Sequence, residues 1–210
     1  MIIFDLDGTL WEAIEATYEA ANLIADKHME LRKISKETIV RGMGLNSEEN
    51  ASNYMPYIST ENGLKYMKEI SDKTSEIINK KNVIIYNGVE ETIKELNKNY
   101  KLGIVTNNRD KYAETFLKIA NLKTYFTDYM GASSYNITKS EAIKIMVNKY
   151  KEKENYYVGD IKKDQEATIE AGIKFIHAKY GFEPNLESEL YIEDIKKLPE
   201  LLKKEKESNK

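Results

Sequence analysis

The sequence predicts an α/β fold: a mainly parallel sheet core with a small helical unit inserted after the first strand. Two observations support this prediction. After residue 83, short apolar segments alternate with amphipathic helical segments, as in right-handed βαβ units. Residues 12–80 contain helical patterns but no clear buried strand. We therefore expect a core made of residues 1–11 and 84–210, with a helical domain over 12–83.

The N-terminal elements follow from local patterns. Residues 2–5, IIFD, predict a short buried strand because apolar residues run into Asp. Residues 12–33 contain good helix formers and neither Gly nor Pro, so a helix is expected there. Helical patterns continue to about residue 80, with breaks at 41–46 and 54–59.

The remaining elements alternate in type. A turn at Asn87-Gly88 follows the apolar segment 83–86, and Thr138 with Glu141 forms a capping box that opens a helix. The expected helices are 89–100, 109–120, 138–150 and 165–172, with a frayed, charged helical tail from 198 to 210. The expected strands are 101–108, 125–131, 155–160 and 173–178.

Composition excludes several classes of protein. The 210 residues are 41% hydrophobic, and no apolar run approaches the roughly 20 residues of a spanning helix. There is no cysteine, which excludes disulfides and thiol catalysis. The net charge of −3 comes from 32 basic and 35 acidic residues, which argues against nucleic acid or an anionic membrane as the main partner. With no basic segment before a long apolar stretch at the N-terminus, a cytoplasmic location is expected.

Polar side chains follow three of the expected strands. They are Asp5 and Asp7, Thr106 and Asn107, and Asp160. Ligands of parallel sheets bind beyond the carboxyl ends of the strands, so these groups should meet at one edge, within reach of Lys139. Crowded carboxylates repel each other unless a cation neutralises them, and Mg²⁺ prefers such oxygen ligands. A lysine and hydroxyl donors beside the metal describe a site for phosphate.

The spacing of Asp5 and Asp7 suits covalent chemistry on phosphorus. On an extended chain the two carboxylates would share a side, roughly 6.6 Å apart. One carboxylate could then attack phosphorus while the other handles the proton of the leaving oxygen. Gly8 lets the backbone turn away and leaves room for a substrate.

Four segments resemble the motifs of the haloacid dehalogenase-like hydrolases in order and spacing. They are DLDGTL (5–10), VTNN (105–108), Lys139 and VGDIKKD (158–164), the last continuing to AG at 171–172. The resemblance covers residues 1–11 and about 84–182. It implies a Rossmann-like core with an inserted helical cap, as in the phosphoglycolate-phosphatase-like subgroup, where the cap closes over the site.

The resemblance also implies roles for the catalytic and phosphate-binding residues. Asp5 would be the nucleophile and Asp7 the general acid and base. Thr106 and the backbone N–H of Asn107 would hold phosphoryl oxygens, and Lys139 would offset charge. The family's dehalogenases lack the second aspartate, so Asp7 favours phosphoryl transfer.

The same resemblance implies a Mg²⁺ site and a cap contact. Asp5, the backbone carbonyl of Asp7, and Asp160 would bind Mg²⁺, and Asp164 would support the metal shell or the lysine. Asp164 could instead be the N-cap of a helix that begins at 165. Arg41, beside the cap loop 42–49, could contact a substrate anion or be an ordinary surface arginine.

We therefore expect a Mg²⁺-dependent phosphatase that hydrolyses a small phosphate monoester through an aspartyl-phosphate intermediate. Its partner would be a small phosphorylated metabolite, with no nucleic acid and no membrane. A sugar-phosphate mutase or a nucleotide or pyrophosphate hydrolase on the same core stays open, and so does a non-catalytic phospho-ligand binding protein. The sequence names neither the substrate nor the oligomeric state.

Overall fold

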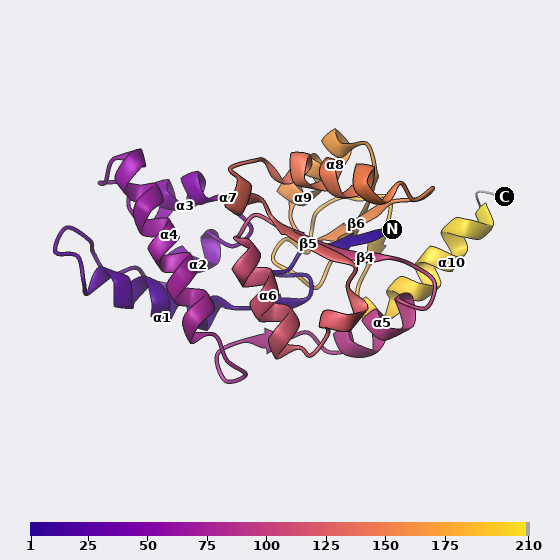
Figure 1. Ribbon diagram of the computed structural model, residues 1–210, viewed down its shortest axis with the longest axis horizontal. Coiled ribbons are helices and arrows are strands. Elements are labelled where there is room, and N and C mark those ends of the chain that lie inside the picture. Colours follow the sequence, from indigo (N-terminus) through magenta and orange to yellow (C-terminus); the bar gives the residue numbers. More distant parts are fainter. Residues whose placement is uncertain (209–210) are drawn as a thin grey trace.

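A six-stranded, entirely parallel sheet lies at the centre of the core in the computed structural model, which describes residues 1–208. In sheet order the strands are β5 (Asp128–Gly131), β4 (Leu102–Thr106), β1 (Ile2–Phe4), β6 (Tyr156–Gly159), β7 (Lys174–Ala178) and β8 (Tyr191–Ile192). The α/β prediction with a Rossmann-like parallel sheet is confirmed. Figure 1 shows helices on both sides of this sheet.

The register of the central strand explains why the predicted site residues converge. Phe4 of β1 pairs with Ile104 of β4 on one side and with Val158 of β6 on the other. All three strands therefore end at the same edge of the sheet. Asp5 follows Phe4 directly, and the polar residues after β4 and β6 lie beside it.

Helices cover both faces of the sheet. The core helices are α5 (Val89–Leu96), α6 (Asp110–Ile119), α7 (Ala132–Tyr135), α8 (Lys139–Tyr150), α9 (Lys162–Ala171) and α10 (Leu198–Ser208), with 3₁₀ turns at Lys123–Tyr125 and Ile195–Lys197. Because strand side chains alternate, Phe4 belongs to an apolar cluster with Phe116 of α6, and Ile3 belongs to another with Met146 of α8. Burial on both faces explains the almost wholly apolar sequence of β1.

Four helices form a separate lobe with its own apolar cluster, beside the sheet in Figure 1. They are α1 (Ile14–Ala25), α2 (Lys36–Arg41), α3 (Ser47–Tyr54) and α4 (Thr60–Ile77). The chain enters and leaves this lobe through an antiparallel pair, β2 (Trp11–Glu12) and β3 (Ile84–Ile85). Trp11 anchors the crossing point, because it is fully buried and packs edge-on against Tyr112 and Phe116.

Several element boundaries differ from the prediction. The helix expected over 12–33 begins at Ile14 and ends at Ala25. The reason is a tertiary contact: the side-chain amide of Asn22 bonds both the backbone N–H and the carbonyl of Ile34, at 3.0 Å each, which folds the following segment back. The strand predicted over 101–108 ends at Thr106.

The two C-terminal helices also differ from expectation. The helix predicted from 165 begins at Lys162, which places Asp164 inside its first turn rather than at the N-cap. The tail is a packed helix, α10, with Leu198 and Leu202 buried, rather than a frayed end. The last two residues of the predicted tail, 209 and 210, lie outside the described residues.

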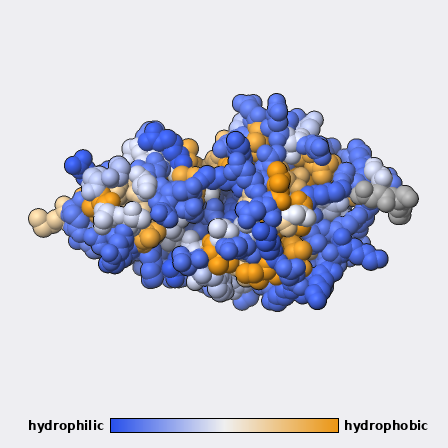
Figure 2. All heavy atoms as spheres, turned by 90° about the horizontal axis from the view of Figure 1, so that it is seen from above, coloured by the Kyte–Doolittle hydropathy of each residue, from blue (hydrophilic) through white to orange (hydrophobic). Residues whose placement is uncertain are grey.

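The surface is mainly hydrophilic on the face drawn in Figure 2, with apolar side chains in small groups. Within residues 1–208, no helix has both the length and the apolar character that crossing a membrane requires.

Candidate active site

A tight loop carries Asp5 and Asp7 away from the end of β1. The carbonyl oxygen of Leu6 accepts hydrogen bonds from the backbone N–H groups of Thr9, Leu10 and Trp11, at 3.1, 2.9 and 3.1 Å. The backbone therefore bends at Leu6 instead of staying extended, and the spacing of roughly 6.6 Å between the carboxylates stays a prediction. Both carboxylates nevertheless line the same cavity.

Gly8 is required at the turn by both conformation and space. Its φ of +85° lies in the left-handed region that side chains disfavour. A Cβ at this position would lie 2.1 Å from Oδ2 of Asp160. The glycine thus lets the loop pass directly over the aspartate that follows β6.

Lys139 joins two buried carboxylates. Its Nζ lies 2.8 Å from Oδ1 of Asp5 and 2.6 Å from Oδ1 of Asp164, and the exposed fractions of the three side chains are 5%, 3% and 0%. Burial alone would lower the pKa of Lys139, but Asp164 and Asp5 outweigh it and raise this pKa. The lysine is therefore fixed in its charged form. Its position follows from the capping box at Thr138, confirmed here, which starts α8 at Lys139.

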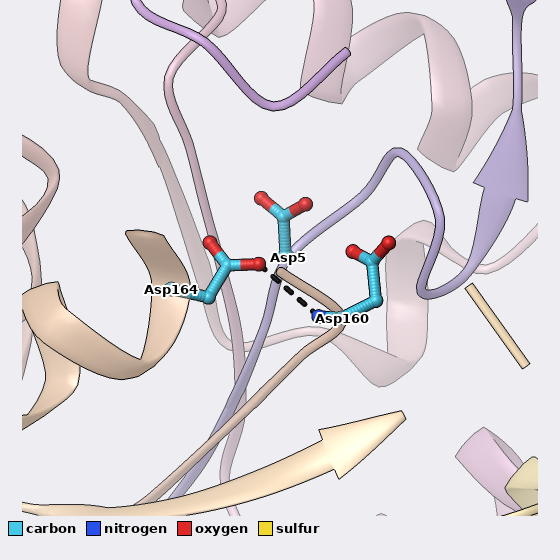
Figure 3. A group of neighbouring side chains, drawn as sticks. All are labelled: Asp5, Asp160 and Asp164. Atoms are coloured by element: carbon cyan, nitrogen blue, oxygen red, sulfur yellow. Dashed lines mark hydrogen bonds between the residues drawn. The ribbon is translucent and has the colours of Figure 1, made fainter. Parts of the chain in front are cut away.

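Asp5, Asp160 and Asp164 form a buried carboxylate cluster (Figure 3). One carboxylate oxygen from each lies within 4.8 Å of the others. Burial raises the pKa of Asp160 well above its usual range, and Asp164 and Asp5 raise it further. Burial likewise raises the pKa of Asp5, although Lys139 opposes this. One lysine does not neutralise three carboxylates, so a divalent cation fits the charge of this cluster.

The three carboxylates are not equally available to a cation. Asp164 uses Oδ1 for Lys139, and its Oδ2 accepts from the backbone N–H of Asp160 at 3.1 Å, the bond drawn in Figure 3. Among the described residues, Asp160 accepts from the Thr9 hydroxyl at 3.3 Å and from the backbone N–H of Phe182 at 2.7 Å. This favours Asp5 and Asp160 as direct ligands and Asp164 as their support.

Asp7 has a different environment from Asp5. Its Oδ1 accepts a 2.6 Å hydrogen bond from the hydroxyl of Tyr112, in α6. Burial raises the pKa of Asp7 to about 7, although the Tyr112 hydrogen bond opposes the shift. A carboxyl group with such a pKa can both donate and accept a proton near neutral pH.

The segment after β4 connects the core to the helical lobe. Thr106 is buried at the strand end, and its Oγ1 accepts from the N–H of Asn108 at 3.2 Å. The side chain of Asn107 donates to the carbonyl of Gly44 in the lobe at 2.8 Å, and Oδ1 of Asn108 accepts from Ser71 in α4 at 2.6 Å. These bonds hold the lobe over the site.

A cavity of about 70 Å³ lies between the core and the lobe. The core contributes the predicted residues Asp5, Asp7, Thr106, Asn107 and Lys139, so the structure brings these together as expected. The lobe contributes the loop at 42–47 and parts of α1, α3 and α4. Arg41 does not line this cavity: it is exposed and donates to Thr38 at 3.1 Å.

A comparison with protein families agrees with the motifs and with the geometry of the site. The family model described as haloacid dehalogenase-like hydrolase matches residues 2–178. The chain belongs to this family. It is accordingly a hydrolase.

Relatives of this haloacid dehalogenase-like hydrolase include proteins with named activities. It is 26% identical over 196 residues to a phosphoglycolate phosphatase of Vibrio vulnificus (strain CMCP6), covering 87% of this chain and 84% of the relative. Among solved structures, a predicted phosphoglycolate phosphatase from Haemophilus somnus 129pt superimposes with a TM-score of 0.81 at 21% identity, covering 96% and 97% of the two chains. A predicted phosphatase from Clostridium acetobutylicum superimposes with a TM-score of 0.79 at 19% sequence identity, covering 98% of this chain and 97% of that structure. At these identities the structures show a shared fold.

Some residues of this hydrolase site were not predicted from the sequence. Thr9, within the first motif, donates to Asp160, and Tyr112 donates to Asp7. The hydroxyl of Tyr157 lies 2.8 Å from the carbonyl of Val105 and 3.4 Å from Asp5. Thr9 could have been found from its place in the motif. The two tyrosines carry no local signal, since aromatic residues on apolar stripes usually belong to a core.

Proposed function

We propose that this hydrolase cleaves a small phosphate monoester through a phosphoryl group carried on Asp5. The observation that carries the proposal is the pairing of two different aspartates on one cavity: Asp5, held by Lys139, and Asp7, held by Tyr112. Two carboxyl groups in distinct environments suit a nucleophile and an acid. The similarity to the Vibrio phosphoglycolate phosphatase supports the same reaction class.

The first half of the reaction would transfer the phosphoryl group to the enzyme. A carboxylate oxygen of Asp5 attacks phosphorus and forms an acyl-phosphate bond, while the bond from phosphorus to the leaving oxygen breaks. Protonated Asp7 gives its proton to that oxygen, so the alcohol leaves neutral. Lys139 offsets negative charge on Asp5 and on the phosphoryl group, and the Thr106 hydroxyl and the backbone N–H of Asn107 hold phosphoryl oxygens.

The second half would return the enzyme to its starting state. Asp7, now a carboxylate, takes a proton from a water molecule, whose oxygen attacks phosphorus. The bond between phosphorus and Asp5 breaks, which restores the Asp5 carboxylate and releases inorganic phosphate. The raised pKa of Asp7, about 7, agrees with its giving and taking a proton in the same cycle.

Mg²⁺ fits the buried carboxylate cluster. Asp5, Asp160 and the backbone carbonyl of Asp7 would hold it, with Asp164 orienting Lys139 and the loop after β6. When bound, Mg²⁺ would neutralise charge on the carboxylates and phosphoryl oxygens. Arg41 has no part in this proposal, because its side chain is turned to Thr38 and to solvent.

Residues 12–83 would act as a cap that excludes water from the reaction. Hydrogen bonds from Asn107 to Gly44 and from Ser71 to Asn108 support this role. The cavity of about 70 Å³ is far smaller than the roughly 300–1,000 Å³ of pockets for larger ligands, which supports a small monoester over a nucleotide.

Phosphate release tests the proposal. A panel of small phosphate monoesters is assayed with and without Mg²⁺, with Asp5→Asn as the blank. We expect metal-dependent release that the variant lacks. Isomerised sugar phosphate without free phosphate would show a mutase instead, and binding without turnover would show a phospho-ligand binding protein.

A further inference from the structure

The helical lobe offers the substrate no positive charge. Within residues 1–208, Lys139 is the one cationic side chain that lines the cavity, and it already pairs with Asp5 and Asp164. Every lobe residue on the cavity wall is uncharged. A leaving group with its own carboxylate would therefore be buried beside this wall without a counter-ion, which is unfavourable.

Four of the five backbone N–H groups of residues 42–46 already have partners, and that of Gly44 has none among the described residues. The N–H groups of Gly42, Met43 and Leu45 donate within the lobe, to Ile39, Val40 and Gly42 at 2.9, 3.1 and 3.2 Å. The N–H of Asn46 donates to the side chain of Glu49 at 3.0 Å. These four donors are consumed by the loop itself, so they do not form an anion site.

One buried lobe side chain has an acceptor atom without a partner within residues 1–208. Asn50 is only 9% exposed, and its Nδ2 donates to the carbonyls of Gly42 and Leu45 at 3.0 and 3.2 Å. Two carbonyl partners fix the orientation of the amide, since an amide oxygen cannot donate to them. Its Oδ1 is buried and has no hydrogen-bond partner among the described residues. Most buried acceptors in proteins have a donor, and a ligand could supply the one that this oxygen lacks.

Tyr54 completes a polar pair beside Asn50. A Cβ at Gly42 would lie 2.2 Å from Oδ1 of Asn50 and 2.6 Å from the hydroxyl oxygen of Tyr54, so both atoms occupy the space beside the bare Cα of Gly42. Both residues line the cavity. Within the described chain the Tyr54 hydroxyl makes no hydrogen bond. The pair can accept from and donate to one hydroxyl group.

We propose that Asn50 and Tyr54 recognise a hydroxyl group on an uncharged leaving alcohol, so that the preferred substrate is a small hydroxyalkyl phosphate rather than a phosphorylated carboxylic acid such as phosphoglycolate. This rests on the proposed phosphatase function and narrows its substrate. A hydroxyl group satisfies Oδ1 of Asn50, whereas a carboxylate would bring negative oxygen against it.

Three phosphate esters of similar size test this inference: 2-hydroxyethyl phosphate, 2-fluoroethyl phosphate, whose fluorine cannot donate, and phosphoglycolate. For the Mg²⁺-loaded wild-type enzyme, we expect kcat/KM for 2-hydroxyethyl phosphate to exceed that for each of the others by about tenfold or more. Equal values for the hydroxyl and fluoro esters, or a preference for phosphoglycolate, would overturn the inference.

A pair of tyrosine variants assigns the effect to the site. Tyr54→Phe removes a hydroxyl that bonds nothing in the described chain, so the fold should persist and the hydroxyl-to-fluoro ratio should fall severalfold. Tyr18→Phe is the matched control, because Tyr18 lies in the same lobe but is 38% exposed and outside the cavity wall. The same ratio in Tyr54→Phe as in wild type would refute the role of Tyr54.

An aryl phosphate separates failure of this inference from failure of the phosphatase proposal. Hydrolysis of the aryl ester without any preference for the hydroxyl ester would leave the phosphatase intact and reject the substrate class. No hydrolysis of any of the four esters would reject both.

Discussion

Replacing Lys139 by methionine should destabilise the metal-free protein far more than an ordinary lysine replacement. Methionine keeps the length and the helix preference of the side chain but removes its charge. Two carboxylates, Asp5 and Asp164, then stay buried without a counter-ion that lay 2.8 and 2.6 Å away. Breaking a buried ion pair from one side costs roughly 3–5 kcal/mol.

Lys144 supplies the matched control in the same helix. It pairs with Glu170 at 3.3 Å, but the two side chains are 42% and 64% exposed. Exposed pairs contribute about 0–1 kcal/mol, because water screens the charges. Lys144→Met should therefore stay close to wild type, and the difference between the two variants isolates the effect of burial.

Urea unfolding in EDTA at pH 8 measures this difference. Trp11 is the single tryptophan and is fully buried, so its fluorescence reports unfolding. The midpoint and slope of each urea transition give the free energy of unfolding. The penalty for Lys139→Met should shrink at acid pH, because burial raises the pKa of Asp5 and its protonation removes part of the unpaired charge. A loss no greater than that of Lys144→Met would refute the reasoning.

Three further changes have expected results. Asp160→Asn should abolish the Mg²⁺-dependent rise in melting temperature. In the wild type, this rise would reflect about 2.7 kcal/mol of stabilisation at a Mg²⁺ concentration one hundred times Kd. A rise retained in the variant would show that Asp160 does not bind the metal. Asp7→Asn should slow hydrolysis of alkyl phosphates much more than that of aryl phosphates, whose leaving groups need little protonation; equal losses would argue against the acid role. Burial lowers the pKa of His177, so the unfolded chain binds its proton more readily, and this residue should lower wild-type stability, relative to a variant without it, as pH drops below about 6.5. His177→Leu should lose that decline in urea titrations between pH 5 and 8, and identical pH profiles would exclude His177 as its cause.

The sequence predicts the part of the site that depends on strand ends and helix starts. Asp5, Thr106 and Asp160 follow strands whose parallel register aligns their carboxyl ends, and Lys139 follows a capping box. These are local signals combined with one topological rule. They suffice to bring distant residues together at one edge.

The remaining contacts depend on tertiary structure that no local pattern encodes. Tyr112 and Asp7 are 105 residues apart, and the contact between Asn22 and Ile34 ends α1 where helix propensity would continue it. Asn50 and Tyr54 lie four residues apart on α3, and the tertiary feature they share is the packing of both side chains against Gly42. Partners of this kind become visible when the chain has folded.

Detection of the covalent intermediate on Asp5 tests the central claim most directly. The enzyme would be mixed with Mg²⁺ and its best small phosphate monoester, quenched in acid, digested, and its N-terminal peptide examined by mass spectrometry. With an aryl phosphate, whose leaving group needs little protonation, the Asp7→Asn variant should increase the yield, because attack by water is slowed more than formation of the intermediate. We predict one added phosphoryl group, located on Asp5 and absent from Asp5→Asn. Phosphate release by the wild-type enzyme without any phosphoryl group on Asp5, or undiminished release by Asp5→Asn, would contradict the account.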